Sequence, residues 1–164
     1  MIGAKFYKPL ETQKQLNEYS AAADWCNNNN ATIVDQGGYY EVVEIPGPTL
    51  EEAKAAKINE LKSTRNTKEL EPILYNGVLF DADKDSLDRL NYAIITLTAT
   101  HTESIDWTTA ENTDVPMSVN DLNLVIASVG NRSNQLHIIY RNLKEQVNAC
   151  TTVEEVDAIT WPED

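Results

Sequence analysis

The sequence contains few of the residues on which metal and redox sites depend. It has two cysteines and two histidines among 164 residues, and these form no CxxC pair and no Cys/His cluster of the kind that holds zinc. Cys26 and Cys150 both fall on apolar helical patterns, so we interpret them as small buried hydrophobic residues. A disulfide between them stays an open alternative. We expect no bound metal.

Motifs for catalysis are also missing from the sequence. The glycines stand singly or in the pair at 37 and 38, so no glycine-rich loop can surround a phosphate. His101 and His137 have no serine or cysteine nucleophile motif beside them. A glycosidase acting through paired carboxylates would be unusual on a small, mostly helical chain. We therefore expect no enzyme activity, no catalytic residues and no cofactor.

One acidic segment matches the beginning of a calcium-binding loop. Asp81, Asp83 and Asp85 occupy the first three ligand positions of an EF-hand, but Ser86 replaces the required glycine and Arg89 brings a cation to a ligand position. Carboxylates at the start of a helix bind its unpaired N–H groups and oppose its dipole. We therefore interpret the segment as an acidic helix start.

The chain has no apolar run near the roughly 18 residues that a membrane span requires. Its N-terminus does not resemble a signal peptide, so synthesis in the cytoplasm is expected. The sequence holds 26 acidic and 13 basic residues, and its net charge of −13 repels phosphate. Neither nucleic acid nor membrane is an expected partner. The acidic surface favours solubility and would suit a basic protein partner.

Pro46-Gly47-Pro48 can continue neither a helix nor a central strand, and it divides the chain. We expect one unit over residues 1–46 and a helical domain over residues 48–164. In the first unit, a helix from about Pro9 to Asn27 is followed by a hairpin with strands at 31–34 and 39–45. The spacing places four apolar residues on one face of that helix: Leu16, Tyr19, Ala23 and Cys26.

For the second domain, the sequence predicts helices separated by short hairpins. A helix begins after Thr49 and ends near Leu70, and Asn76-Gly77 predicts a tight hairpin because both residues accept positive φ. Further helices are expected at 83–100, from Ser118 onward and from Thr152 onward, with a hairpin over 107–116. The fold class is α+β and mainly helical.

The helix after Ser118 carries a heptad pattern, and its length would reach roughly 50 Å. Either it protrudes and pairs with another chain, or it kinks at Gly130. Its apolar stripe is covered by the chain's own helices or by intermolecular pairing, and both alternatives stay open. The candidate assembly surface, called the seam below, consists of Leu122, Ile126, Val129, Leu136, Tyr140, Leu143 and Val147.

The order of motifs over about residues 48–161 resembles a domain of unknown function that recurs in phage and prophage tail-fibre assembly proteins and tail-fibre-associated proteins. The matching motifs are the capped helix at 49–53, the segments 75–77 and 80–83, Ser86 and Arg89, the stretch 107–112 followed by Val115, Leu136-His137 and the ending 149–161. The residues singled out as a candidate structural motif are Asn76, Gly77, Asp81, Asp83, Arg89, Trp107 and Trp161.

This resemblance implies a biological setting and carries no catalytic residues with it. It implies a non-catalytic tail-fibre assembly chaperone or tail accessory protein, whose partner is a tail-fibre or other tail protein. The alternative is a structural component that is retained in the mature tail. Assembly into a homo-oligomer stays an open alternative. The expected location is the cytoplasm of the bacterial host, with the virion as the alternative.

Overall fold

The computed structural model describes residues 1–163. The chain forms two compact units, Met1–Pro48 and Thr49–Asp164, which we describe separately. Within the described residues there are five helices and three small antiparallel sheets. The prediction of a mainly helical α+β fold is confirmed.

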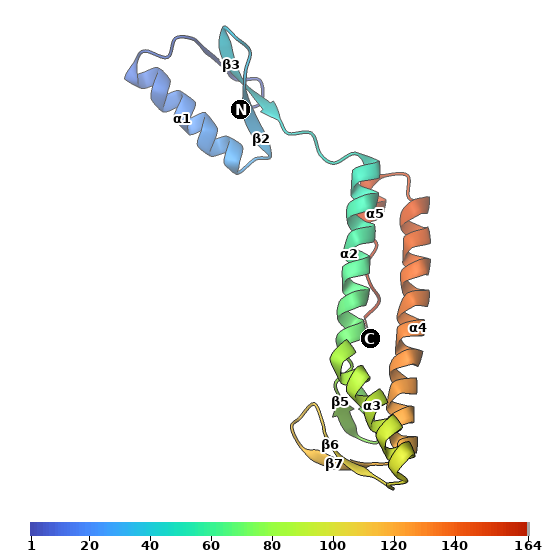
Figure 1. Cartoon of the computed structure of the whole chain (residues 1–164). Coiled ribbons are helices and arrows are strands. Elements are labelled where there is room, and N and C mark those ends of the chain that lie inside the picture. Colours follow the sequence, from blue (N-terminus) through green and yellow to red (C-terminus); the bar gives the residue numbers. More distant parts are fainter. Residues whose placement is uncertain (164) are drawn as a thin grey trace. The chain divides into compact units, whose positions relative to one another are not determined.

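The first unit packs one helix against a three-stranded sheet (Figure 1). Its elements are β1 (Lys5–Tyr7), α1 (Gln13–Asn27), β2 (Ala31–Asp35) and β3 (Tyr39–Glu44). The predicted hairpin is the β2–β3 pair, and β1 adds to the outer edge of β3, giving the order β1-β3-β2. The strand β1 was not expected from the sequence.

The buried face of α1 differs from the predicted face. Ala22 and Cys26 are buried against the sheet, and Tyr19 places its ring against aromatic rings of β1 and β3. Leu16 is 45% exposed and Ala23 is half-buried, so the predicted apolar face agrees with the buried face only at Tyr19 and Cys26. The sheet covers the face that contains residues 19, 22 and 26. Leu16 lies three residues before Tyr19, at the rim of that face, where the three short strands do not cover it.

The second unit is built on two long helices. The helices α2 (Leu50–Leu70) and α4 (Val119–Ala149) lie side by side, and α5 (Val153–Asp157) packs against α2 (Figure 1). The first part of α4, around Leu122, packs against α3 (Lys84–Thr100). None of the helices over residues 1–163 has the length and apolar character that crossing a membrane requires.

Two hairpins accompany α3. One consists of β4 (Ile73–Tyr75) and β5 (Val78–Phe80), and the other of β6 (Ile105–Thr108) and β7 (Asp114–Met117). Asn76 and Gly77 have φ values of 50° and 81°, as the predicted turn requires. The second hairpin begins two residues earlier than predicted.

Local capping sets the helix starts. Thr49, Ser118 and Thr152 each accept a hydrogen bond from the backbone N–H three residues later, and the acid at that third position bonds back to the cap. Asp83 caps α3 through its carboxylate, which accepts from two backbone N–H groups. The interpretation of the acidic segment as a helix start is thereby confirmed for Asp83.

Two separate apolar cores share the helix α4. The first joins α3, both hairpins and the first part of α4, and its buried members are Phe80, Leu90, Ala93, Leu97, Met117, Leu122 and Val125. The second joins α2, α5 and the last part of α4, and its buried members are Ala53, Leu61, Leu143, Val147 and Val156. The long helix is therefore covered by different elements along its length.

The packing of these two cores on α4 explains why the seam residues are apolar. Leu122, Val129, Leu136, Leu143 and Val147 are buried within the chain, and Ile126 and Tyr140 are half-buried. The helix α4 runs without a break over its 31 residues, and Gly130 lies in its interior. The structure thus favours the alternative in which the chain's own helices cover the stripe.

The cysteines follow the prediction in part. Cys26 is buried in the first unit, whereas Cys150 is half-buried at the end of α4, where its Sγ lies 3.3 Å from the Gln146 carbonyl oxygen. Both are free thiols.

Candidate functional site

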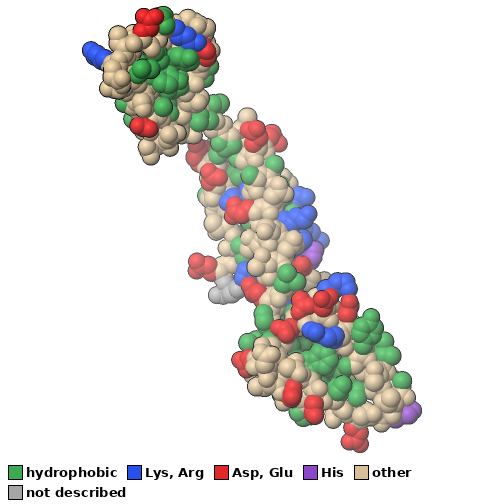
Figure 2. Space-filling model, turned by 60° about the vertical axis from the view of Figure 1, so that its left-hand side comes forward, with side chains coloured by type: hydrophobic (Ala, Val, Ile, Leu, Met, Phe, Trp, Pro, Cys, Tyr) green, Lys and Arg blue, Asp and Glu red, His purple; other side chains and the backbone are tan. Residues whose placement is uncertain are grey.

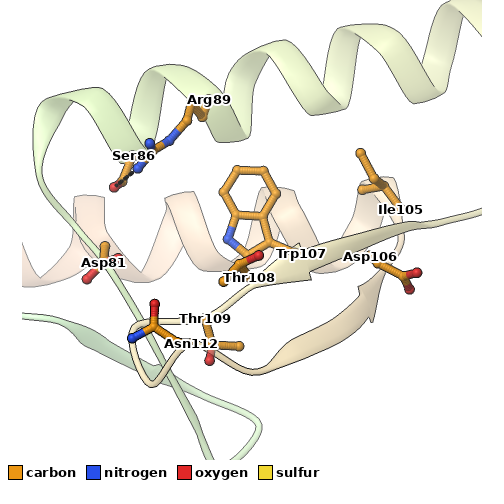
Figure 3. A pocket seen from close by; sticks show the side chains of 9 residues that line it. All are labelled: Asp81, Ser86, Arg89, Ile105, Asp106, Trp107, Thr108, Thr109 and Asn112. Atoms are coloured by element: carbon orange, nitrogen blue, oxygen red, sulfur yellow. Dashed lines mark hydrogen bonds between the residues drawn. The ribbon is translucent and has the colours of Figure 1, made fainter.

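A pocket of about 420 Å³ lies between α3 and the β6–β7 hairpin (Figure 3). Its size falls within the range of about 300–1,000 Å³ that is common for small-molecule sites. The residues that line it are Asp81, Ser86, Arg89, Ile105, Asp106, Trp107, Thr108, Thr109 and Asn112.

The start of α3 fixes the cationic side of the pocket. The Asp83 carboxylate accepts from the backbone N–H of Ser86 at 3.0 Å and from the Ser86 hydroxyl at 2.7 Å. The Ser86 Oγ in turn accepts from Nη2 of Arg89 at 2.8 Å. The helix cap and the serine therefore hold the guanidinium at the start of α3, where Arg89 lines the pocket beside Ser86 (Figure 3).

These contacts also set the charge state of the cap. The pKa of Asp83 is lowered, first by the hydrogen bond from the Ser86 hydroxyl and then by the backbone N–H of Ser86, with a smaller contribution from the Arg89 charge. Asp83 is thus ionised at neutral pH, as is the guanidinium. The pocket beside them carries Asp81 as a second carboxylate.

Trp107 forms the apolar wall. Its side chain is half-buried and packs against the first core, and Figure 3 shows its indole between α3 and the strand β6. The ring nitrogen faces the side of the pocket where Asp81 and Asn112 lie. Across residues 1–163, no side-chain hydrogen bond is made by the Trp107 indole, the Asp81 carboxylate or the Asn112 amide.

The floor near the turn is already hydrogen-bonded. Thr109 is buried, and its hydroxyl lies 2.9 Å from the Thr113 hydroxyl. The backbone N–H of Ala110 donates to the Leu79 carbonyl at 3.0 Å, which joins this turn to the other hairpin. Asp106 points away from the pocket in Figure 3, so its carboxylate adds little to the lining.

The predicted motif residues fall into separate places. Asp81, Arg89 and Trp107 come together in the pocket. Asn76 and Gly77 form the β4–β5 turn, and Asp83 caps α3 without lining the pocket. Trp161 packs against the second core instead.

Ile105, Thr109 and Asn112 were not singled out as site residues. Alternation along a strand offered a signal for two of them, because residues 105, 107 and 109 fall on the same face. Asn112 lies in the turn between β6 and β7, where it adopts a φ of 57°. The sequence indicated that turn without indicating that it borders a pocket.

The carboxyl groups with resolved pKa shifts all shift in the same direction. The pKa values of Asp35, Glu52, Asp83, Asp121 and Glu155 are lowered, in each case chiefly by hydrogen bonds from neighbouring groups. General acid–base catalysis at neutral pH uses a carboxyl whose pKa is raised toward neutrality. Within the described chain, no group of three or more His, Cys, Asp or Glu side chains is arranged to hold a metal.

A polar cluster joins α2 and α4 between the two cores. The Glu69 carboxylate accepts from the Ser133 hydroxyl at 2.9 Å and lies 3.1 Å from Nε2 of His137. Arg132 donates to the carbonyl oxygens of Glu69 and Pro72 at 2.9 and 3.1 Å. The Glu69 carbonyl belongs to the last turn of α2, where a helix leaves its carbonyl groups unpaired, and Pro72 follows the helix end.

Large apolar side chains are exposed near α3. Tyr92 and Ile95 are 68% and 64% exposed, and their spacing of three places them beside each other on one helix face. Leu74 on β4 is 63% exposed. Figure 2 shows hydrophobic side chains on the surface of the second unit, with acidic and basic side chains among them. We call the pair Tyr92 and Ile95 the α3 surface.

Comparisons with known proteins give one match. No curated protein and no solved structure matches the chain. Residues 52–160, which span α2 to the segment after α5, match the domain of unknown function DUF4376. Since this match covers more than half of the sequence, the chain belongs to the DUF4376 family.

Proposed function

We propose that this chain is a phage tail-fibre assembly protein or tail accessory protein that acts by binding another tail protein, without catalysis. The observation that carries the binding role is the α3 surface, where two large apolar side chains are exposed side by side. The tail setting is supported by the resemblance of the motifs between residues 48 and 161 to domains in tail-fibre-associated proteins.

The α3 surface is suited to docking because of its energetics. Fully burying a large apolar side chain contributes about 1.5–3 kcal/mol. Aromatic residues are common among the side chains that dominate binding energy. Asp85 and Asp88 precede the pair on the same helix, where Asp88 is ion-paired with Lys84, and the chain carries a net charge of −13. A partner with an apolar patch and a basic rim would complement this surface, and the charge would accelerate encounter.

The acidic groups whose pKa shifts are resolved have structural roles. The resolved carboxyl shifts are all downward, which makes these groups weak bases at neutral pH. They act as helix caps or ion-pair partners. The proposed partner is a tail-fibre or other tail protein, met in the cytoplasm of the bacterial host.

Co-expression with the tail-fibre protein of the same genome tests this role. The chain should co-purify with the fibre and raise the yield of fibre trimers. The double variant Tyr92→Ser/Ile95→Ser should lose both effects. Ile138→Ser is the matched control, because Ile138 is also an exposed apolar residue, 48% exposed, but lies on α4. Equal trimer yields with and without the chain would refute the assembly role.

Mass spectrometry of purified particles separates assembly from a place in the mature tail. An assembly protein is released and should be absent from the particles. A stoichiometric amount in the particles would favour the alternative, a structural component retained in the virion.

A further inference from the structure

We propose that the pocket between α3 and the β6–β7 hairpin binds a neutral pyranose sugar. This inference concerns a site separate from the α3 surface and does not depend on the tail-protein role. It rests on the polar groups that the pocket leaves unpaired, on the opposite charges of Arg89 and Asp81, and on the half-buried indole of Trp107 that lines the pocket.

The pocket presents both donors and acceptors that the described residues do not satisfy. Arg89 donates one N–H to Ser86, and its other N–H groups can donate to a ligand. The indole N–H of Trp107 adds a donor, the Asp81 carboxylate adds an acceptor, and the Asn112 amide offers both. A sugar hydroxyl donates and accepts at once, so a ring with several hydroxyls can meet this mixed set.

The charges in the pocket disfavour ionic ligands. An anion drawn to Arg89 would also lie near Asp81, within a chain of net charge −13. A cation drawn to Asp81 would lie near Arg89. A neutral ligand with hydroxyl groups can bind both side chains, because a carboxylate and a guanidinium each have two atoms that match adjacent hydroxyls.

Trp107 supplies the contact that a sugar ring needs besides hydrogen bonds. A pyranose has apolar C–H faces, and an indole offers a flat apolar surface with a polar N–H at its edge. In Figure 3 the indole stands inside the pocket beside Arg89 and Ser86. The volume of about 420 Å³ accommodates a ligand of this class.

The cationic side of the pocket is prepared before a ligand arrives. Asp83 holds Ser86, and Ser86 holds Arg89, through bonds of 2.7 and 2.8 Å. A fixed side chain loses less conformational freedom on binding than a mobile one, which favours affinity. Asp83 is therefore a positioning residue for the proposed site.

The three tryptophans provide a direct readout on the full chain. Indole N–H signals of the ¹⁵N-labelled protein are recorded by NMR during titration with D-glucose, D-galactose or N-acetyl-D-glucosamine, with Trp107→Phe used for assignment. We expect the Trp107 signal to shift and saturate with at least one sugar, while the Trp25 and Trp161 signals stay in place.

Two variants link the shift to the pocket. Arg89→Ala should weaken sugar binding roughly tenfold to a hundredfold, as expected for the loss of hydrogen bonds to a charged group. Arg141→Ala is the matched control, because Arg141 is exposed on α4 and does not line the pocket. It should bind like the unaltered chain, and the signal of Trp161, which packs in the same unit as both arginines, shows whether each variant remains folded.

Three results would overturn the proposal. The first is that none of the sugars moves the Trp107 signal at any concentration up to their solubility. The second is a larger shift with sodium glutamate or lysine hydrochloride, which would identify an ion site. The third is sugar binding by Arg89→Ala that equals that of Arg141→Ala.

Discussion

Leu122 and Leu124 provide a matched test of how α4 is covered. They lie two residues apart on the same helix, yet Leu122 is fully buried and Leu124 is 43% exposed. Replacing either by alanine changes helix propensity equally, so the difference between the variants reports burial. Leu122→Ala should cost about 3 kcal/mol, since it removes contacts and leaves a cavity in the first core. Leu124→Ala should cost about 1 kcal/mol or less.

Urea unfolding followed by circular dichroism measures both changes, and thermal unfolding gives a second estimate. For a unit of this size, the Leu122 variant should lose about 10 °C in melting temperature. If the chain's own helices are all that covers the seam, no second chain pairs with it. Light scattering on the unaltered chain should then give the mass of a monomer, 18.4 kDa. Equal losses in both variants, or a Leu122→Ala change that alters mass without altering stability, would refute the intrachain packing.

Three further predictions concern glycine, acid and arginine sites. Gly77→Ala should destabilise the protein by about 1 kcal/mol, because the φ of Gly77 is +81°. Gly130→Ala should stabilise it by up to about 1 kcal/mol, because Gly130 lies inside α4 with open space around it. Thermal unfolding measures the sign of both changes. The pKa of Asp121 is lowered, chiefly by the Ser118 hydroxyl, so its stabilising effect is present above the ordinary carboxyl pKa and is lost as pH falls through the lower folded value. The unfolding midpoint of Asp121→Asn should therefore lie below that of the unaltered chain at neutral pH and approach it in acid. Arg132→Met should lose about 1–3 kcal/mol in urea unfolding, because the part-buried Glu69 carbonyl in the last turn of α2 loses its donor.

The structural features that were predicted well are those whose sequence signals lie within a few residues of one another. Thr49 with Glu52, and Ser118 with Asp121, marked helix starts because the bonds of a capping box join residues three apart. Asn76 with Gly77 marked a turn because positive φ is a property of the residues themselves. In these places local preference and the final fold agree, so the pattern alone was sufficient.

Pairing between distant segments could not be predicted in the same way. The strand β1 has three residues, and it exists because Lys5–Tyr7 can bond to the outer edge of β3. Nothing within those three residues specifies that partner. The exposure of Leu16 has the same origin, since the area that the sheet covers decides which face of α1 is buried.

The pocket shows the same limit for function. Asp81, Arg89 and Trp107 were singled out from the sequence, but as parts of a structural motif. Their meeting depends on how α3 and the β6–β7 hairpin pack on the first core, which brings residue 107 back beside residues 81–89. The chemistry of the side chains was visible in the sequence, whereas their convergence was not.

The heptad pattern of α4 carries the most general consequence. A heptad shows that one stripe of a helix is buried over its whole length, but it does not show what covers that stripe. Here α3 and the hairpins cover the part around Leu122, and α2 with α5 covers the part around Leu143. Between them, Arg132 and Ser133 bond to Glu69 and fix the register of α2 on α4. Because both cores include the same helix, a loss of packing at either end should weaken the other, and the Leu122→Ala variant should accordingly lose the helical signal of the second unit in one transition.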